Sequence, residues 1–231
     1  MFISAIVVAA GLSKRFKTKT SKVLLKLSSK PVIAYSLDVL NAHPKIKEII
    51  IAANPRNIES LRGIFNTHKF PPGVKVVLGG KERKDSVAAG LKAVNPKADF
   101  VLIHDAARPF ITSGLVSLVM NEAYESKAAI LGVPVKATIK RCRVQGTGYR
   151  VQETIDRKDL WEIQTPQVFE KDLILKAYQR FSNTDATDDA MLVERLGVKV
   201  SVVFGSYNNI KITTTEDLAI AEGVARLWKP A

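Results

Sequence analysis

The fold of this chain is decided by its opening stretch, residues 2–11, which reads Phe2-Ile3-Ser4-Ala5-Ile6-Val7-Val8-Ala9-Ala10-Gly11. The apolar part is typical of a strand buried on both faces of a sheet. The small residues at its end let backbone N–H groups approach a phosphate closely. Ligands of open α/β sheets gather at the carboxyl ends of strands, so the stretch predicts an α/β sheet with an anion site after its first strand.

Cations follow this strand, and no carboxylate precedes Asp38. The basic residues of this stretch are Lys14, Arg15, Lys17, Lys19, Lys22, Lys26 and Lys30. Such a stretch favours a polyphosphate site, although its glycine spacing matches neither the dinucleotide fingerprint nor the Walker A loop. On these residues alone, a tight turn with solvated lysines stays open as the alternative.

The composition narrows the choice of ligand. The 231 residues carry a formal net charge of +13, which fits nucleic acid, an anionic membrane surface or a small anionic substrate. No helix-turn-helix, zinc-finger or aromatic RNA-binding pattern occurs, so we favour the small anion. Cys142 is the only cysteine, and the three histidines lack metal-ligand spacing. We expect no signal peptide and no membrane span, because no apolar run approaches the ~20 residues that a span needs.

Strand-like and helix-like segments alternate along the chain. Strands are predicted at 3–8, 49–53, 74–78, 100–104, 128–133 and 198–204, and helices at 32–40, 56–65, 86–94, 115–125, 171–180, 187–196 and 215–228. This alternation predicts one three-layer α/β domain over residues 1–231, with a mostly parallel sheet and right-handed crossovers.

One region interrupts the alternation between Pro134 and about Pro166. Two alternating segments flank Gly146-Thr147-Gly148, which predicts a β-hairpin. Long ordered insertions in compact domains are often functional. An arm that packs on a second subunit and a simple surface excursion both remain open from the residues themselves.

Two further loops follow predicted strands. Gly79-Gly80 would let a planar ligand lie against bare backbone, and Asp85 or Ser86 would cap the next helix; an ordinary capped loop is the alternative. Asp105 ends another strand, within His104-Asp105-Ala106-Ala107-Arg108-Pro109, where a carboxylate suits Mg²⁺ bound with phosphate oxygens. An Asp–Arg pair capping a turn is the alternative there, and we expect His104 to be a structural hydrogen-bonding residue.

The order and spacing of many motifs resemble the 2-C-methyl-D-erythritol 4-phosphate cytidylyltransferase family from end to end. The motifs are Ala9-Ala10-Gly11 with Arg15 and Lys22, Gly80 with Arg83 and Ser86, residues 104–109, Asp156-Arg157, Leu160-Trp161, Thr165-Pro166-Gln167, Thr187-Asp188 and Asn209-Ile210-Lys211-Ile212-Thr213. The resemblance implies a Rossmann-like nucleotidyltransferase sandwich that works as a homodimer through a β-hairpin arm at residues 134–165.

The resemblance also implies a role for each motif. CTP would be bound by Ala9, Ala10, Gly11, Gly80 and Ser86, and Asp105 would ligate Mg²⁺. Asp85, from the loop after Gly80, is a further candidate nucleotide-binding residue. The catalytic residues in contact with phosphates would be Arg15, Lys22 and Lys211. Ala107, Arg108, Thr165 and Thr187 would line the side of the sugar-alcohol phosphate, which Thr138 and Arg157 would contact from the partner subunit.

The implied reaction joins CTP to 2-C-methyl-D-erythritol 4-phosphate and releases pyrophosphate, in the non-mevalonate route to isoprenoids. A phosphate monoester is already an anionic nucleophile, so the site needs cations rather than a general base. Two features depart from the family pattern. Ser21 and Val23 flank Lys22 where many relatives have proline and glutamine, and Asn208 and Asn209 leave the metal site with one carboxylate.

Two other functions compete with this interpretation. A cytidylyltransferase for another polyol phosphate, such as ribitol 5-phosphate, would share the fold and most nucleotide motifs. A non-catalytic basic module that binds nucleotides or nucleic acid would explain the charge of +13. We expect an enzyme of the bacterial cytoplasm without nucleic-acid or membrane partners, and a mature plastid form also fits.

Overall fold

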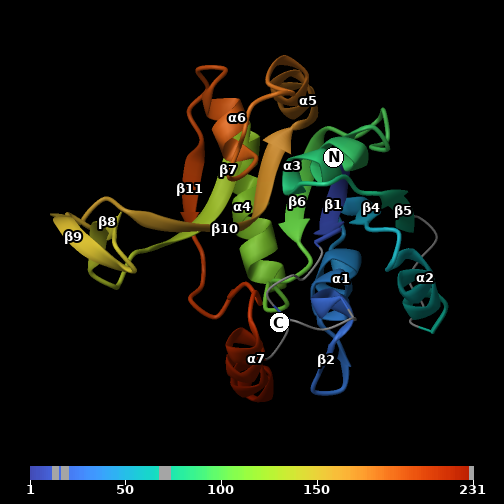
Figure 1. Ribbon diagram of the computed structural model, residues 1–231. Helices are drawn as coiled ribbons and strands as arrows, with labels where there is room; N and C mark the ends of the chain where they lie inside the picture. The colour runs from blue at the N-terminus through green and yellow to red at the C-terminus, as the bar shows by residue number, and fades with distance from the viewer. Residues whose placement is uncertain (12–15, 17–20, 68–73, 229–231) are drawn as a thin grey trace.

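The computed structural model describes residues 1–11, 16, 21–67 and 74–228. Its centre is a seven-stranded sheet of order β11-β7-β10-β6-β1-β4-β5 (Figure 1). The strands are β1 (Ile3–Ala9), β4 (Ile46–Ala53), β5 (Val74–Leu78), β6 (Phe100–Asp105), β7 (Ala128–Pro134), β10 (Trp161–Glu170) and β11 (Ser201–Phe204). Only β10 runs antiparallel to its neighbours among these strands, so the predicted mostly parallel sheet is confirmed.

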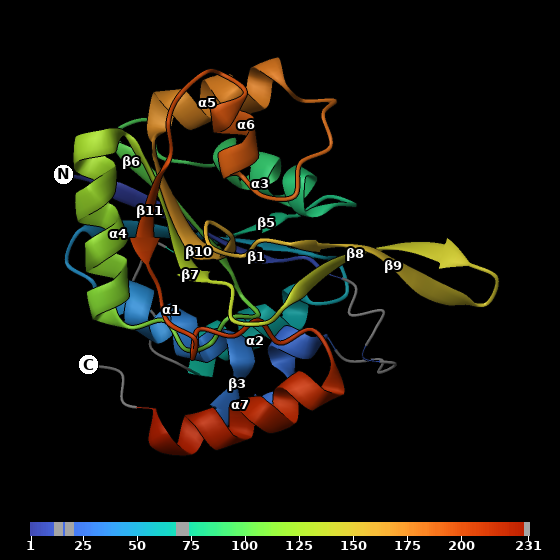
Figure 2. The same ribbon diagram turned by 90° about the vertical axis from the view of Figure 1, so that its left-hand side faces the viewer.

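Helices cover both faces of the sheet, as Figure 2 shows. One face packs against α1 (Val32–Ala42), α2 (Ile58–Thr67) and α4 (Ser113–Ser126), and the other against α3 (Arg83–Leu91), α5 (Lys171–Arg180) and α6 (Ala190–Glu194). Successive side chains of β1 alternate between the two layers: Ala5 and Val7 face the first, and Ile6 faces the second. The predicted three-layer architecture is therefore confirmed.

A smaller apolar cluster lies beside the first layer. The C-terminal helix α7 (Thr215–Leu227) packs there against the short hairpin of β2 (Lys26–Leu27) and β3 (Lys30–Pro31). Tyr35, Phe110 and Trp228 meet in the cluster with ring centroids 5.5–6.2 Å apart. This packing anchors the segment that includes the 3₁₀ turn η2 (Lys22–Leu24), and so anchors the backbone of Lys22.

Strand β10 is not predicted from the sequence. Its residues do not resemble a buried strand, because Gln164, Thr165 and Gln167 are polar and Pro166 interrupts the apolar pattern. Most of its first half therefore falls in the region expected to form the arm. The strand nevertheless lies between β6 and β7, and all three polar residues are buried. Residues 161–164, expected to lie in the arm, pair instead with β7 in the central sheet.

The predicted hairpin is present as β8 (Ile139–Gln145) and β9 (Gly148–Ile155), which pair with each other and form a sheet of their own. Gly146 lies in its turn with φ +58°, a conformation that favours glycine. The hairpin projects from the body of the domain (Figure 2), and nearly all of its residues are exposed.

The structure also bears on the bounds of one predicted helix and on the expectation of no membrane span. Helix α6 is shorter than the predicted 187–196: it begins only after Asp188 and Asp189, and it ends at Glu194. No helix within the described part of the chain combines the length and apolarity that crossing a membrane would require.

The order of the strands fixes where a ligand site forms. The chain runs from β1 outward to β4 and β5, and then returns to place β6 on the other side of β1. The carboxyl end of β1 is thus the topological switch point, where loops on its two sides diverge and leave a crevice. Described residues that directly follow β1, β5 and β6, each singled out in the sequence, all border that crevice.

Candidate active site

A pocket of about 210 Å³ occupies this crevice. It is lined by Val8, Ala9, Ala10, Gly11, Lys22, Val23, Gly80, Lys81, Glu82, Arg83, Ser86, Asp105, Ala107 and Lys211. Three charged residues that are far apart in the chain, Lys22, Asp105 and Lys211, thus converge on one cavity together with the small residues of the first loop. Arg15 lies outside the described residues.

Close packing holds the loop after β1 in place. Asn54 and Asn57, which follow β4, donate side-chain hydrogen bonds to the carbonyls of Ala10 and Ala9, at 3.3 and 3.5 Å. A Cβ atom at Gly79 would lie 2.5 Å from the Cβ atom of Ala10, so only glycine allows this approach. The two asparagines belong to no motif that the sequence singles out, so their role is visible only in the structure.

The loop after β5 folds onto the first turn of α3. The Ser86 hydroxyl accepts a hydrogen bond from the Gly80 N–H at 3.1 Å and donates one to the Glu82 carbonyl at 3.0 Å. The Asp85 carboxylate accepts from the Glu82 N–H at 3.1 Å, and Asp85 is not among the residues that line the pocket. The helix begins at Arg83 rather than at Ser86.

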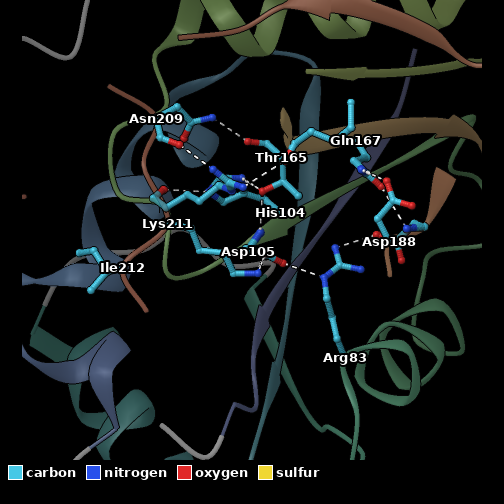
Figure 3. A network of polar contacts seen from close by, with 12 residues as sticks. Arg83, His104, Asp105, Thr165, Gln167, Asp188, Asn209, Lys211 and Ile212 are labelled. Atoms are coloured by element: carbon cyan, nitrogen blue, oxygen red, sulfur yellow. Dashed lines mark hydrogen bonds and ion pairs between the residues drawn. The ribbon is translucent and has the colours of Figure 1, made fainter. Parts of the chain in front are cut away.

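An ionic network crosses the floor of the site (Figure 3). Asp105 Oδ1 lies 2.9 Å from Arg83 Nε, and Asp105 Oδ2 lies 2.5 Å from Lys211 Nζ. Arg83 Nη2 also lies 2.8 Å from Oδ2 of the buried Asp189. Burial by itself would raise the pKa of Asp105, but the positive charges of Arg83 and Lys211 outweigh it and hold that pKa well below its usual range. Asp105 is therefore anionic at neutral pH.

A second, wider pocket of about 560 Å³ lies on the other side of this network. Arg83, Asp105 and Lys211 line both pockets, so the ion pairs form their shared boundary. The second pocket is also lined by Arg108, Ile130, Ile163, Gln164, Thr165, Gln167, Thr187, Asp188, Met191, Glu194, Val200 and Val202. Ala107, expected on the same side, lines the first pocket instead.

Backbone carbonyls orient two of the cations. Arg108 donates to the carbonyl of Asn209 at 2.7 Å and to that of Ile163 at 3.3 Å. Lys22 donates to the carbonyl of Ile212 at 2.7 Å. Each bond joins a loop near β1 or β6 to a segment much later in the chain. These hydrogen bonds fix the direction of both side chains.

His104 and Thr165 form the support beneath Asp105. His104 Nε2 lies 3.0 Å from the Arg108 carbonyl, which can only accept, so Nε2 carries the proton. His104 Nδ1 then accepts from the Thr165 hydroxyl at 3.1 Å, and that hydroxyl accepts from the Asp105 N–H at 3.0 Å. Burial lowers the pKa of His104 to about 4, so the ring is neutral and structural, as its sequence context suggested.

Comparison with known proteins agrees with this geometry. A family model described as 2-C-methyl-D-erythritol 4-phosphate cytidylyltransferase matches residues 3–226. The chain belongs to this family. The resemblance drawn from the sequence is thereby confirmed.

Individual members of the cytidylyltransferase family match over nearly their whole length. The enzyme of that name from Caldanaerobacter subterraneus subsp. tengcongensis is 44% identical over 225 residues, covering 96% of this chain and 98% of the relative. The one from Halalkalibacterium halodurans is 42% identical over 226 residues, with 97% of each chain covered.

Solved structures of the same family share the fold. The 4-diphosphocytidyl-2C-methyl-D-erythritol synthase of Anaerococcus prevotii superposes with a TM-score of 0.84 at 33% identity, covering 97% of this chain and 98% of that one. The cytidylyltransferase of Thermus thermophilus gives a TM-score of 0.77 at 31% identity, with 98% and 100% covered. The Rossmann-like nucleotidyltransferase fold is therefore confirmed.

Two residues that the family resemblance placed at the site lie away from both pockets within one chain. Thr138 and Arg157 stand at the base of the β8–β9 arm, where both are exposed. The Arg157 side chain donates to the carbonyl of Lys136, which joins the segment after β9 to the segment before β8.

The donor set around Asp105 suits a magnesium ion that is shared with a nucleotide. No cluster of three or more His, Cys, Asp or Glu side chains able to hold a metal occurs among the described residues. Mg²⁺ commonly takes one or two carboxylates and completes its shell with phosphate oxygens and water. Asp105 lines both pockets, and its Oδ2 already contacts the cationic Lys211 ammonium, so the carboxylate fits such an ion.

The stability of this family member should fall in acid because of His104. Between about pH 6.5 and pH 4 the unfolded chain binds a proton that the buried ring rejects, so the free energy of unfolding decreases as the pH falls. The complete loss amounts to at most ~3 kcal/mol. Urea unfolding at pH 7, 5.5 and 4 measures it. The variant His104→Gln should lose less stability over this interval, and an equal loss in both proteins would contradict the assignment.

Proposed function

We propose that this protein transfers the cytidylyl group of CTP to 2-C-methyl-D-erythritol 4-phosphate and releases pyrophosphate, the reaction for which its family is named. The observation that carries the proposal is the convergence of Lys22, Asp105 and Lys211 on one pocket that small residues of two loops also line. Backbone N–H groups and fixed cations together form the surroundings that a triphosphate requires.

The first pocket would hold CTP. Ala9, Ala10 and Gly11 border it from the end of β1, and Gly80 and Ser86 border it from the start of α3. Lys22 and Lys211, with Arg15 from the preceding loop, would contact the phosphates and stabilise the charge that develops at the reacting phosphorus. Asp85 would act indirectly, because its carboxylate holds the Glu82 N–H and so shapes the loop beside the nucleotide.

Asp105 would hold Mg²⁺ in the complex. When bound, the ion would neutralise phosphate charge and favour the departure of pyrophosphate. The ammonium of Lys211 would then be available to the phosphates, because it contacts the same carboxylate oxygen in this structure.

The second pocket would receive the sugar-alcohol phosphate. Arg108, Thr165 and Thr187 line it, and Ala107 lies at the edge of the first pocket. A phosphate oxygen of this substrate would attack the α-phosphorus of CTP in line, forming a new P–O bond as the bond to the β-phosphate oxygen breaks. The phosphate is already anionic, so no proton has to be removed and the enzyme contributes position and positive charge.

The arm would complete the second pocket from a partner subunit of a homodimer. Val144, Tyr149 and Val151 on the hairpin are 75%, 79% and 55% exposed, which is unusual for apolar side chains on a small projecting hairpin. If the arm packs on a second copy, Thr138 and Arg157 would face the partner's substrate. We place the dimer in the cytoplasm, with no nucleic-acid or membrane partner.

Product analysis tests the proposed reaction. Incubation with CTP, Mg²⁺ and 2-C-methyl-D-erythritol 4-phosphate should give 4-diphosphocytidyl-2-C-methyl-D-erythritol and pyrophosphate. Ribitol 5-phosphate should give far less. Turnover with ribitol 5-phosphate alone would replace this function with the nearest competing one, and turnover that survives chelation of divalent metal would contradict the role of Mg²⁺.

Lys22 should be essential for the chemical step. The Lys22→Ala variant should lower kcat about 10²–10³-fold, because a fixed cation beside the reacting phosphate stabilises the transition state by ~2.7–4 kcal/mol. Lys47→Ala is the matched control, since Lys47 is an exposed lysine on β4 outside both pockets. Near-normal turnover by Lys22→Ala would exclude the role.

Mixing two defective variants tests the shared site. Lys22→Ala damages the site of its own subunit, whereas Arg157→Ala would damage the site of its partner. Random pairing makes half of the dimers mixed, and each mixed dimer keeps one intact site, so co-expression should restore about a quarter of wild-type activity. Activity equal to the average of the two separate variants would show that Arg157 does not act across the dimer.

A further inference from the structure

One buried carboxylate has no part in the reaction described above. The Asp189 side chain is completely buried behind Arg83, just before α6 begins. Its Oδ1 accepts from the Tyr178 hydroxyl at 2.5 Å, and its Oδ2 accepts from Arg83 Nη2 at 2.8 Å. The backbone N–H of Asp189 donates to Gln167 Oε1 at 3.2 Å. Burial of a charge is costly unless it is paired, so this arrangement requires the positive charge of Arg83.

Arg83 is divided between two carboxylates. Its Nε contacts Asp105 Oδ1 and its Nη2 contacts Asp189 Oδ2, so the guanidinium makes one contact with each acid. A guanidinium fork can bind both oxygens of a single carboxylate in parallel. The contact of Asp189 with Nη2 keeps Arg83 from doing so, and Asp105 Oδ2 is left to Lys211.

The charges of the network sum to zero. Arg83 and Lys211 are positive, and Asp105 and Asp189 are negative. Loss of the Asp189 charge would leave the network with one excess positive charge and allow Arg83 to move toward Asp105. Both changes would repel a divalent cation from Asp105, and both would attract a metal-free triphosphate.

We propose that Asp189 is a positioning residue that acts through Arg83 to keep one oxygen of Asp105, and its negative charge, available to a divalent cation that arrives with CTP. Asp189 thereby makes the binding of CTP depend on the metal. The inference rests on the proposed function, because it requires that CTP occupy the first pocket.

Calorimetric titration with CTP, in the absence and in the presence of saturating Mn²⁺, tests the inference without turnover. In the wild type, Mn²⁺ should increase the affinity for CTP. In Asp189→Asn, which has nearly the same shape without the charge, this enhancement should shrink about tenfold, while metal-free CTP binds at least as tightly as to the wild type. A general structural defect would weaken both affinities, so the opposite directions identify the electrostatic effect.

Two variants separate charge from packing. Tyr178→Phe removes the other hydrogen bond that the Asp189 carboxylate accepts but keeps its charge and its contact with Arg83, so the Mn²⁺ enhancement should persist. In the double variant Arg83→Gln with Asp189→Asn, both charges of this ion pair are removed together, and residue 83 no longer competes for Asp105. The enhancement should therefore equal or exceed that of the wild type, which shows that Asp189 acts through Arg83.

The outcomes are distinct. An unchanged enhancement in Asp189→Asn, or a parallel loss of both affinities, overturns the inference. So does a wild type that binds CTP equally well with and without Mn²⁺. If thermal unfolding shows that Asp189→Asn does not fold, a double variant with a weaker enhancement than the wild type overturns it. A wild type that binds no CTP under either condition overturns the proposed function and this inference with it.

Discussion

The carboxylate of Asp105 is the point on which the rest of the site depends. It stands at the carboxyl end of β6, with its side chain 8% exposed, and such a position in water-poor surroundings disfavours a charge. Arg83 from α3 and Lys211 from the segment before α7 compensate for that cost with direct contacts. The two cations come from opposite sides of β1 and β6 and lie more than a hundred residues apart in the chain. Their shared carboxylate therefore holds these distant segments together.

This ionic centre explains why a central strand carries polar residues. Thr165 on β10 supports the backbone of Asp105, and Gln167 positions the backbone of Asp189. Gln164 accepts from the side chain of Asn209, which also donates to the Thr165 carbonyl. Buried polar groups of this kind are tolerated because they are hydrogen-bonded, and here they fix the segments that present Lys211 and Arg108. The middle of the sheet thus provides both the core and the support of the site.

The buried polar residues of β10 also explain why part of the fold could not be predicted from the sequence. Strands such as β1 and β4 were predictable, because a run of Ile, Val and Ala has little alternative to burial in a sheet. Strand β10 was not, because its polar residues satisfy partners on other elements, and those partners are visible only in three dimensions. The first loop, Gly80, Asp105 and Lys211 were found from their place after strands or from the family resemblance. In the sequence, Asp189 stands where an acidic residue simply favours a helix start, and nothing nearby shows that it contacts Arg83.

The pairing of charges also bears on how a basic site can be both stable and ready for its ligand. Lys211 and Arg83 are neutralised by Asp105 and Asp189 before any phosphate arrives, so they do not repel one another in the unliganded fold. Lys22 and Arg108 each donate to a backbone carbonyl, which orients the side chain. Under the proposed function, the incoming triphosphate meets cations that already have fixed positions, so little reorganisation is needed when charge builds up at the phosphorus. Preorganisation of this kind requires acids as much as bases, and the position of each acid determines which cation is released to the substrate and which stays with the protein.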